Sequence, residues 1–171
     1  MSADHYLGNP NLKKVGTEIQ FTQEQIQEYL KCKEDPVYFA MNYIKIISLD
    51  EGIVPFKMWD FQQELIEKFH KHRFNIAKLP RQTGKSTTCV SYLLHYVLFN
   101  DNVNVGILAN KLSTARDLLG RLQLAYEQLP MWMQQGIVVY NKGSMELENG
   151  SKILAASTSA SAVRGMSFNI L

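Results

Sequence analysis

The sequence has few cysteines, almost no excess of charge and no long apolar run, and each of these shortages excludes a class of protein. Its 2 cysteines provide neither a disulfide framework nor, without histidines, a four-ligand zinc site. Its 18 basic and 16 acidic side chains leave a net charge of +2, which excludes a strongly basic nucleic-acid arm but not a local basic groove. The longest apolar stretch, residues 90–99, is too short to cross a bilayer, and residues 1–5 lack the basic start of an export signal. We therefore expect a soluble cytoplasmic protein with reduced thiols and no membrane partner.

The composition that remains is that of an ordinary globular protein. A chain of 171 residues that is 46% hydrophobic and 20% charged suits one domain, or slightly more, with a substantial core. The pattern changes twice along the chain and divides it into three parts. We expect an extended arm at 1–20, a helical region at 21–73 and a partial α/β core at 74–171.

The helical region carries the start signals of its helices. Thr22 and Gln25 have the spacing of a capping box, and Asp35 before Pro36 is typical of a cap followed by proline at the first helical position. A third helix is expected from about 60 to 73. We expect residues 50–55 to form a loop, and the second helix to bury three side chains, Phe39, Tyr43 and Ile47.

The remaining chain alternates between strand and helix patterns. Alternation of this kind is typical of a mostly parallel sheet flanked by helices. The residues Asn149 and Gly150 lie between two short apolar segments and indicate a hairpin turn. The expected strands are 74–79, 104–109, 137–140, 144–147 and 152–156, and the expected helices are 84–99 and 111–128. Residues 168–171 resemble the start of a further buried strand, so we expect the chain to be part of a longer protein.

The segment that carries chemistry is the loop at 80–87. Its Gly84-Lys85-Ser86 sequence matches the end of the phosphate-loop pattern G-x-x-x-x-G-K-[ST], although the position of the first glycine is occupied by Leu79. Glycine lets backbone amides approach phosphate oxygens, and the helix that begins there directs its positive end at the anion. In this interpretation Lys85 reaches the β- and γ-phosphates and Ser86 holds magnesium. The competing interpretation is an ordinary strand-to-helix turn.

Other residues around the loop each have two interpretations. The Arg81 guanidinium could offset charge that develops on the γ-phosphate, or it could be a surface arginine in a salt bridge. The amide of Gln62 could pair with the adenine edge, and Phe61 could stack on the base, but plain core packing is the simpler interpretation of both. Arg164 could face a nucleotide, a nucleic-acid track or solvent.

The run from Trp59 to Leu171 resembles the ATPase domain of the large terminase subunit of tailed bacteriophages, particularly the T-even type. Five segments carry the resemblance: 60–62, 79–86, 106–109, 141–144 and 163–168. The arm residues 6–10 are similar as well. In that family the loop also contains an arginine and lacks its first glycine, so Leu79 fits the pattern.

The resemblance implies a fold, an activity and a set of site residues. The fold would be that of a P-loop (RecA-like) ATPase, and the activity would be ATP hydrolysis that drives double-stranded DNA into an empty capsid. ATP and Mg²⁺ would be the cofactors. Arg81 and Lys85 would be catalytic, Ser86 would hold the metal, and the nucleotide would be bound by Phe61, Gln62, Gln82, Thr83, Gly84, Lys85, Ser86 and Thr87. The partners would be double-stranded DNA, the portal protein of the procapsid and the small terminase subunit, in the cytoplasm of the infected host, with a ring on the portal as one allowed arrangement.

Two features that hydrolysis needs are absent from the sequence as it stands. The magnesium-binding aspartate and the neighbouring catalytic glutamate of the family should follow the strand that begins at Asn169. We therefore expect this chain to bind ATP but to hydrolyse it poorly. A helicase-type ATPase is the alternative enzyme, because helicases also combine an upstream glutamine with this loop. A docking domain with a chance loop match is the non-enzymatic alternative.

Overall fold

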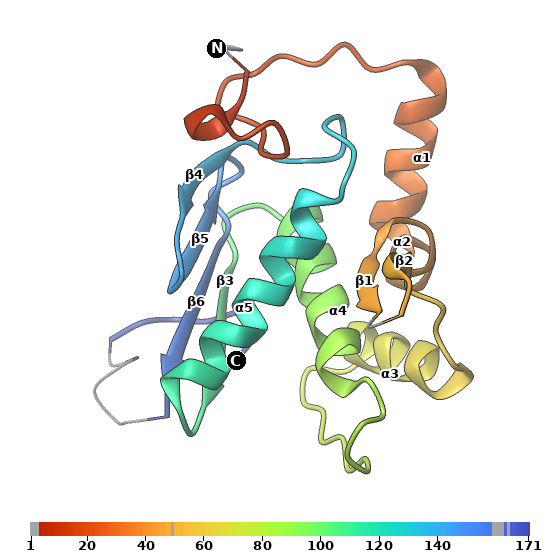
Figure 1. Ribbon diagram of the computed structural model, residues 1–171, viewed down its shortest axis with the longest axis vertical. Coiled ribbons are helices and arrows are strands. Elements are labelled where there is room, and N and C mark those ends of the chain that lie inside the picture. Colours follow the sequence, from red (N-terminus) through yellow and green to blue (C-terminus); the bar gives the residue numbers. More distant parts are fainter. Residues whose placement is uncertain (1–3, 49, 159–162, 164) are drawn as a thin grey trace.

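The structure, a computed structural model, describes residues 4–48, 50–158, 163 and 165–171 (Figure 1). Short helices and a small hairpin come first, and a sheet covered by two longer helices follows. In chain order the elements are η1 (Tyr6–Gly8), α1 (Gln23–Glu34), α2 (Pro36–Tyr43), β1 (Lys45–Ser48), β2 (Gly52–Pro55), α3 (Asp60–Lys71), α4 (Lys85–Phe99), β3 (Asn104–Ala109), α5 (Leu112–Glu127), β4 (Ile137–Tyr140), β5 (Ser144–Leu147) and β6 (Lys152–Ser157).

The main sheet has the strand order β3-β6-β5-β4 and is mixed in orientation. Only its β3–β6 pair is parallel, and the β6–β5 and β5–β4 pairs are antiparallel. The expectation of a mostly parallel sheet is therefore wrong, although the α/β class is confirmed. The reason is the length of the connections, since short turns such as the one at Asn149 and Gly150 can join only antiparallel strands. That hairpin itself is confirmed, and Gly150 has a φ of +80°.

One hydrophobic cluster joins the helical region to the sheet. The helix α5 packs against β3 and β6, and α4 packs against α5, α3 and α2. The largest fully buried side chains are contributed by both parts of the chain, including Phe39, Ile66, Leu94, Leu98, Leu119, Leu122, Met145 and Ile153. The burial of apolar area from all the helices in one cluster therefore stabilises a common core.

The C-terminal end of α4 is fixed to the β5–β6 turn. The Asn149 side-chain amide donates to the carbonyl oxygens of Val97 at 2.9 Å and Asn100 at 3.1 Å. The Ser151 hydroxyl also donates to Asn100 O, at 2.7 Å. Because the last carbonyls of a helix have no partner within it, these bonds satisfy the end of α4 with groups from the sheet.

The start signals of the first two helices are confirmed. Gln25 N donates to the Thr22 hydroxyl at 3.2 Å, and Thr22 N donates to the Gln25 side chain at 3.0 Å. The Asp35 carboxylate accepts from two backbone N–H groups of α2, each at 2.9 Å, and Pro36 is the first residue of that helix. These local motifs form because each one satisfies N–H groups that the helix leaves unpaired.

The segment after α2 is a hairpin, which corrects two expectations. Ile47 is not buried by a helix but lies in β1, paired with Ile53 of β2, and is 64% exposed. Residues 50–55 are not all loop, because β2 begins at Gly52. The helix α2 ends at Tyr43 because Ile44, Ile46 and Ile47 are β-branched and favour extended backbone.

Residues 74–79 do not form the expected strand. They lie outside every sheet of the described chain, with the Phe74 side chain 85% exposed and the Ile76 side chain fully exposed. A strand needs a neighbour that supplies hydrogen bonds. The free edge of β3 is occupied by Ile170, which pairs in parallel with Val105. The further strand expected near 168–171 is thus present as a single bridge.

Residues 11–14 are docked onto the sheet. Lys14 pairs in parallel with Ile137 at the edge of β4, and Leu12 is 2% exposed. The Gln134 side chain accepts from Lys13 N at 3.0 Å and donates to Asn11 O at 3.0 Å. From there the chain crosses one end of the molecule to reach α1 (Figure 1). The part expected to be an extended arm therefore covers the edge of β4.

Candidate functional site

The loop before α4 adopts an unusual backbone conformation. Gln82 has a φ of +63° and Gly84 has a φ of +71°, both in the left-handed region. Gly84 is the cap of α4, and the helix begins at Lys85, one residue after the start that the sequence predicts. Glycine suits this position because it adopts a positive φ without steric cost. The two left-handed residues lie in the turn that leads from residues 74–79 into the helix.

Side chains of the loop close it on itself. Lys85 Nζ donates to the carbonyl oxygens of Leu79, at 3.3 Å, and of Pro80. The Thr83 hydroxyl also donates to Pro80 O, at 3.1 Å, and the Thr88 hydroxyl donates to Gly84 O, also at 3.1 Å. The Lys85 ammonium is thus held by two neutral acceptors of the loop backbone.

The backbone of this loop has free donors. Thr88 N donates to Gly84 O at 3.0 Å and closes the first turn of α4. Within the described chain no group accepts from the N–H of Gly84, Lys85, Ser86 or Thr87. The first N–H groups of a helix lack intrahelical partners, and they carry the positive end of its dipole. The arrangement can therefore bind an anion such as phosphate.

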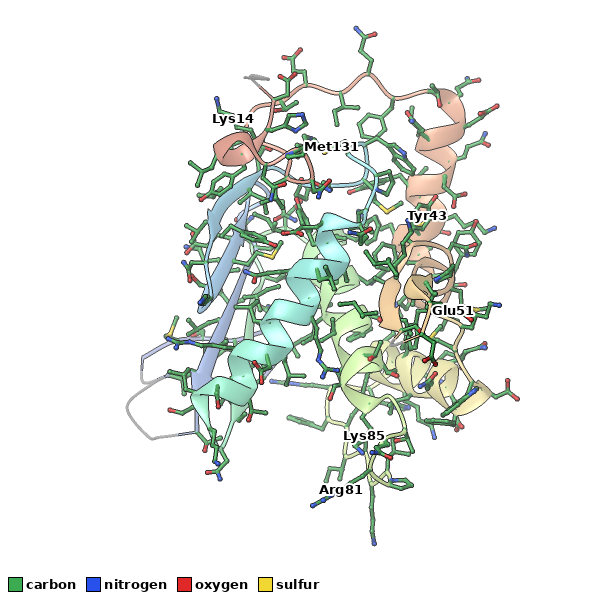
Figure 2. All side chains as sticks on the ribbon, in the orientation of Figure 1. Lys14, Tyr43, Glu51, Arg81, Lys85 and Met131 are labelled. Carbon is green, nitrogen blue, oxygen red and sulfur yellow. The ribbon has the colours of Figure 1, made fainter. Side chains whose placement is uncertain are left out.

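Figure 2 shows Arg81 and Lys85 together at the loop end of α4, away from Lys14 and Met131 at the opposite end of the molecule. Arg81 is exposed. The ion pairs among the described residues are Lys68–Glu64 and Lys152–Glu146, so Arg81 has no acidic partner there. Arg164 lies outside the described residues.

Gln62 is brought against the loop from α3. Its side chain is 4% exposed, its Nε2 donates to Thr83 O at 3.1 Å, and its Oε1 accepts from Trp59 N at 3.0 Å. Phe61 is half-buried, with its ring 5.6 Å from that of Trp59. Gln62 is a candidate from the sequence, but no local signal reveals its contact with residue 83.

A cavity that the sequence analysis missed lies beside the start of α4. Its volume is about 310 Å³, and it is lined by the β1 segment, α4 and α5. The lining residues are Ile44, Lys45, Ile46, Ile47, Thr87, Val90, Ser91, Arg121, Leu124 and Ala125. Thr87 belongs to both the loop and the cavity. Nothing in the sequence indicates this cavity because one of its walls is the hairpin that the sequence does not predict.

Metal-binding clusters and bilayer-spanning helices are not found in the described chain. No group of three or more histidine, cysteine or acidic side chains is placed to hold a metal ion there. None of its helices combines the length and apolar character that a membrane crossing requires. Cys32 and Cys89 are free thiols, as expected, and burial raises the pKa of Cys89 although the nearby Lys85 opposes this shift.

These features define a mixed α/β protein whose glycine loop opens a helix with free amide donors. The model of one protein family, described as the N-terminal part of the large terminase subunit of T4-like viruses, matches residues 76–171. The match covers more than half of the chain and includes the loop and the sheet, so the chain belongs to this terminase family. Membership implies a role in packaging viral DNA and favours this role over a helicase. Large terminase subunits are generally ATPases.

Proposed function

We propose that this chain is the ATP-binding part of a viral DNA-packaging motor and that residues 80–87 hold the triphosphate with Mg²⁺. The observation that carries the proposal is the start of α4, where Gly84 is left-handed and the N–H groups of residues 84–87 are free. Family membership supplies the second support, because a packaging motor needs a source of chemical energy. In the proposed motor, ATP hydrolysis is coupled to translocation of double-stranded DNA.

Each loop residue has a defined task in this proposal. Lys85 exchanges the carbonyl oxygens of Leu79 and Pro80 for oxygens of the β- and γ-phosphates. The amides of residues 82–87 bind the phosphate chain. Arg81, exposed beside the loop, offsets charge on the transferred phosphoryl group.

In this proposal the loop supplies one ligand of the magnesium ion, and phosphate oxygens supply others. Ser86 is exposed at the first turn of α4, and no hydrogen bond of its hydroxyl occurs within the described chain. A single hydroxyl is a weak ligand, so the ion would be held by Ser86 together with phosphate oxygens. When bound, the metal would neutralise charge on the phosphates.

The proposed fold is that of a P-loop ATPase, in which a glycine loop precedes a helix and its backbone amides hold the phosphates. Among the described residues, no carboxylate makes a hydrogen bond or an ion pair with residues 80–87. We therefore expect this chain to bind ATP more readily than it hydrolyses it, since hydrolysis needs a carboxylate that orients water.

The proposed partners follow from the packaging role. They are double-stranded DNA, the portal protein of the procapsid and the small terminase subunit, with a ring of large subunits on the portal, in the cytoplasm of the infected cell. These partners are proposed on family membership.

Calorimetric titration of the chain with Mg-ATP tests the nucleotide site. We expect saturable binding that Lys85→Ala weakens at least tenfold, because the variant loses the charge opposite the phosphates. Lys78→Ala is the matched control: it removes an exposed lysine from the segment before the loop and should leave the affinity within about twofold. Equal binding by the wild type and Lys85→Ala, or no binding by the wild type, would refute the proposed site.

A further inference from the structure

The cavity beside the start of α4 is enclosed by parts of the chain that lie far apart in the sequence. On each of its two helices the lining residues are spaced three and four positions apart, so they share one face of the helix. They are Thr87, Val90 and Ser91 on α4 and Arg121, Leu124 and Ala125 on α5. Residues 44–47 form the remaining wall. The volume of about 310 Å³ suits a small molecule.

Most of the cavity lining is apolar. The side chains of Ile44, Val90 and Ala125 are buried, whereas Ile47 is exposed and is paired across the hairpin with another exposed isoleucine, Ile53. An apolar body placed in the cavity would contact the buried side chains and remove part of Ile47 from water. The hydrophobic effect therefore favours a ligand with a hydrocarbon part.

The charged groups of the lining are all positive. Lys45 and Arg121 line the cavity, and its described lining includes no aspartate or glutamate. Neither cation forms an ion pair or a side-chain hydrogen bond among the described residues. The Thr87 hydroxyl likewise has no hydrogen-bond partner in that part of the chain. The electrostatic complement of this lining is an anion.

We infer that the cavity binds a small amphipathic anion, whose charged head pairs with Lys45 and Arg121 and whose hydrocarbon part lies against the apolar walls. The two cations favour an anion over a neutral or positive ligand. The apolar walls favour a carboxylate on a hydrocarbon chain over a bare inorganic anion such as sulfate. The inference does not depend on the proposed triphosphate site, because the cavity and the phosphate loop use different cations.

An NMR titration of the isotopically labelled chain with octanoate tests the site. Octanol, which has the same hydrocarbon chain without the charge, is the comparison ligand. For octanoate we expect saturable amide shifts centred on Thr87, Val90 and Arg121, with a dissociation constant on the order of 1 mM. Octanol should bind about fivefold more weakly or less tightly still. Shifts scattered over the surface, no saturation, or equal affinities for the two ligands would overturn the inference.

Two arginine variants of α5 test the role of the charge. Arg121→Gln should weaken octanoate about fivefold and leave the affinity for octanol unchanged. Arg116→Gln is the matched control, because Arg116 is an exposed arginine of the same helix that does not line the cavity. The control should bind octanoate as the wild type does. Equal losses in the two variants would overturn the pairing of the ligand with Arg121.

A third variant blocks the cavity itself. Ala125 is buried and lines the cavity, and the flexible side chain of methionine fills irregular space. Ala125→Met should therefore weaken octanoate and octanol at least about tenfold. The amide spectrum shows whether this variant is folded, and if it is not, the result with Arg121→Gln decides the question. Octanoate binding of wild-type strength by folded Ala125→Met would overturn the inference.

A competition experiment separates this inference from the proposed function. Mg-ATP is added to the octanoate-saturated chain, and we expect octanoate to stay bound because the phosphates would pair with Lys85 and not with Arg121. Displacement of octanoate would make the cavity part of the nucleotide site and overturn the inference. If the chain binds no Mg-ATP, the proposed function fails, whereas the octanoate titrations still decide whether the cavity is a site.

Discussion

The Tyr43 hydroxyl of α2 donates a hydrogen bond to the Glu28 carboxylate of α1 at 2.9 Å. Tyr38 donates to the same oxygen, also at 2.9 Å. One carboxylate therefore fastens two consecutive helices. Burial, and next this hydrogen bond, raise the pKa of the Tyr43 hydroxyl, because ionisation would place two negative charges together.

Removal of this carboxylate should loosen the first two helices. Glu28→Ala leaves both hydroxyls without their acceptor, and we expect it to lower the free energy of unfolding by about 2 kcal/mol. Gln27→Ala, at an exposed position of the same helix, should change it by less than about 0.5 kcal/mol. Urea unfolding followed by circular dichroism measures both, and equal values for the two variants would contradict the prediction.

Alanine should have opposite effects at two glycines. Gly84→Ala forces a side chain into the left-handed region and against Gln62, so we expect the free energy of unfolding to fall by about 1–2 kcal/mol. Gly120 lies within α5, where a Cβ meets no atom within 4 Å, and Gly120→Ala should raise stability by about 0.5–1 kcal/mol. Thermal unfolding distinguishes the two, and a stabilised Gly84→Ala variant would show that the turn tolerates a side chain.

The docked first residues should contribute to stability through one side chain. Leu12 is 2% exposed and belongs to the main core, whereas Leu7 is 90% exposed. We expect Leu12→Ala to cost about 3 kcal/mol of unfolding free energy and Leu7→Ala to cost almost nothing. Chemical unfolding of the two variants under the same conditions is the measurement. If both variants lose equally little unfolding free energy, the segment around Leu12 contributes little to stability.

His95 should make stability depend on pH. Its Nε2 lies 2.9 Å from Cys32 O, its buried Nδ1 has no partner among the described residues, and burial above all lowers its pKa from 6.5 to about 4. Between about pH 4 and pH 6.5, His95 binds a proton in the unfolded chain but not in the folded chain. Stability should therefore fall as the pH is lowered from about 6.5 to about 4, by about 3 kcal/mol in total.

Urea unfolding at several pH values tests this dependence. The variant His95→Phe should lose most of the slope between pH 4 and 6.5, although it will be less stable throughout because Cys32 O loses its partner. His72→Gln, which changes an exposed histidine, is the control and should keep the slope. An unchanged slope in His95→Phe would assign the dependence to other groups.

The sequence predicts best those features that depend on neighbouring residues. The capping box of Thr22 and Gln25, the helix start at Lys85 and the hairpin at Asn149 are all formed, because each motif satisfies its own hydrogen bonds within a few residues. The short connections within 137–157 allow only antiparallel pairs, so that part of the sheet orientation was within reach of the sequence. The parallel pairing of β6 with β3 joins segments that lie far apart in the chain, and no local pattern indicates it.

In the candidate site, too, local features can be read from the sequence and contacts between distant residues cannot. Gly84 and Lys85 are recognisable from their spacing, but the contact of Gln62 with residue 83 joins positions 21 apart. Phe74 and Ile76 have the apolar pattern of a strand, yet a pattern cannot supply the neighbouring strand that would bury them. The cavity beside Thr87 was likewise hidden, because its wall is built by a hairpin whose β-branched residues also fit a helix face.

The hydrogen bonds that Asn149 and Ser151 make to the end of α4 have a consequence for the loop at the start of that helix. The 15 residues of α4 form a rod of about 22 Å, with the loop of Lys85 at one end and the β5–β6 turn at the other. If α4 tilts at its loop end, the β5–β6 turn must move with it or three hydrogen bonds must break. Helix α4 therefore connects the free amide donors at its start to the β5–β6 turn at its end.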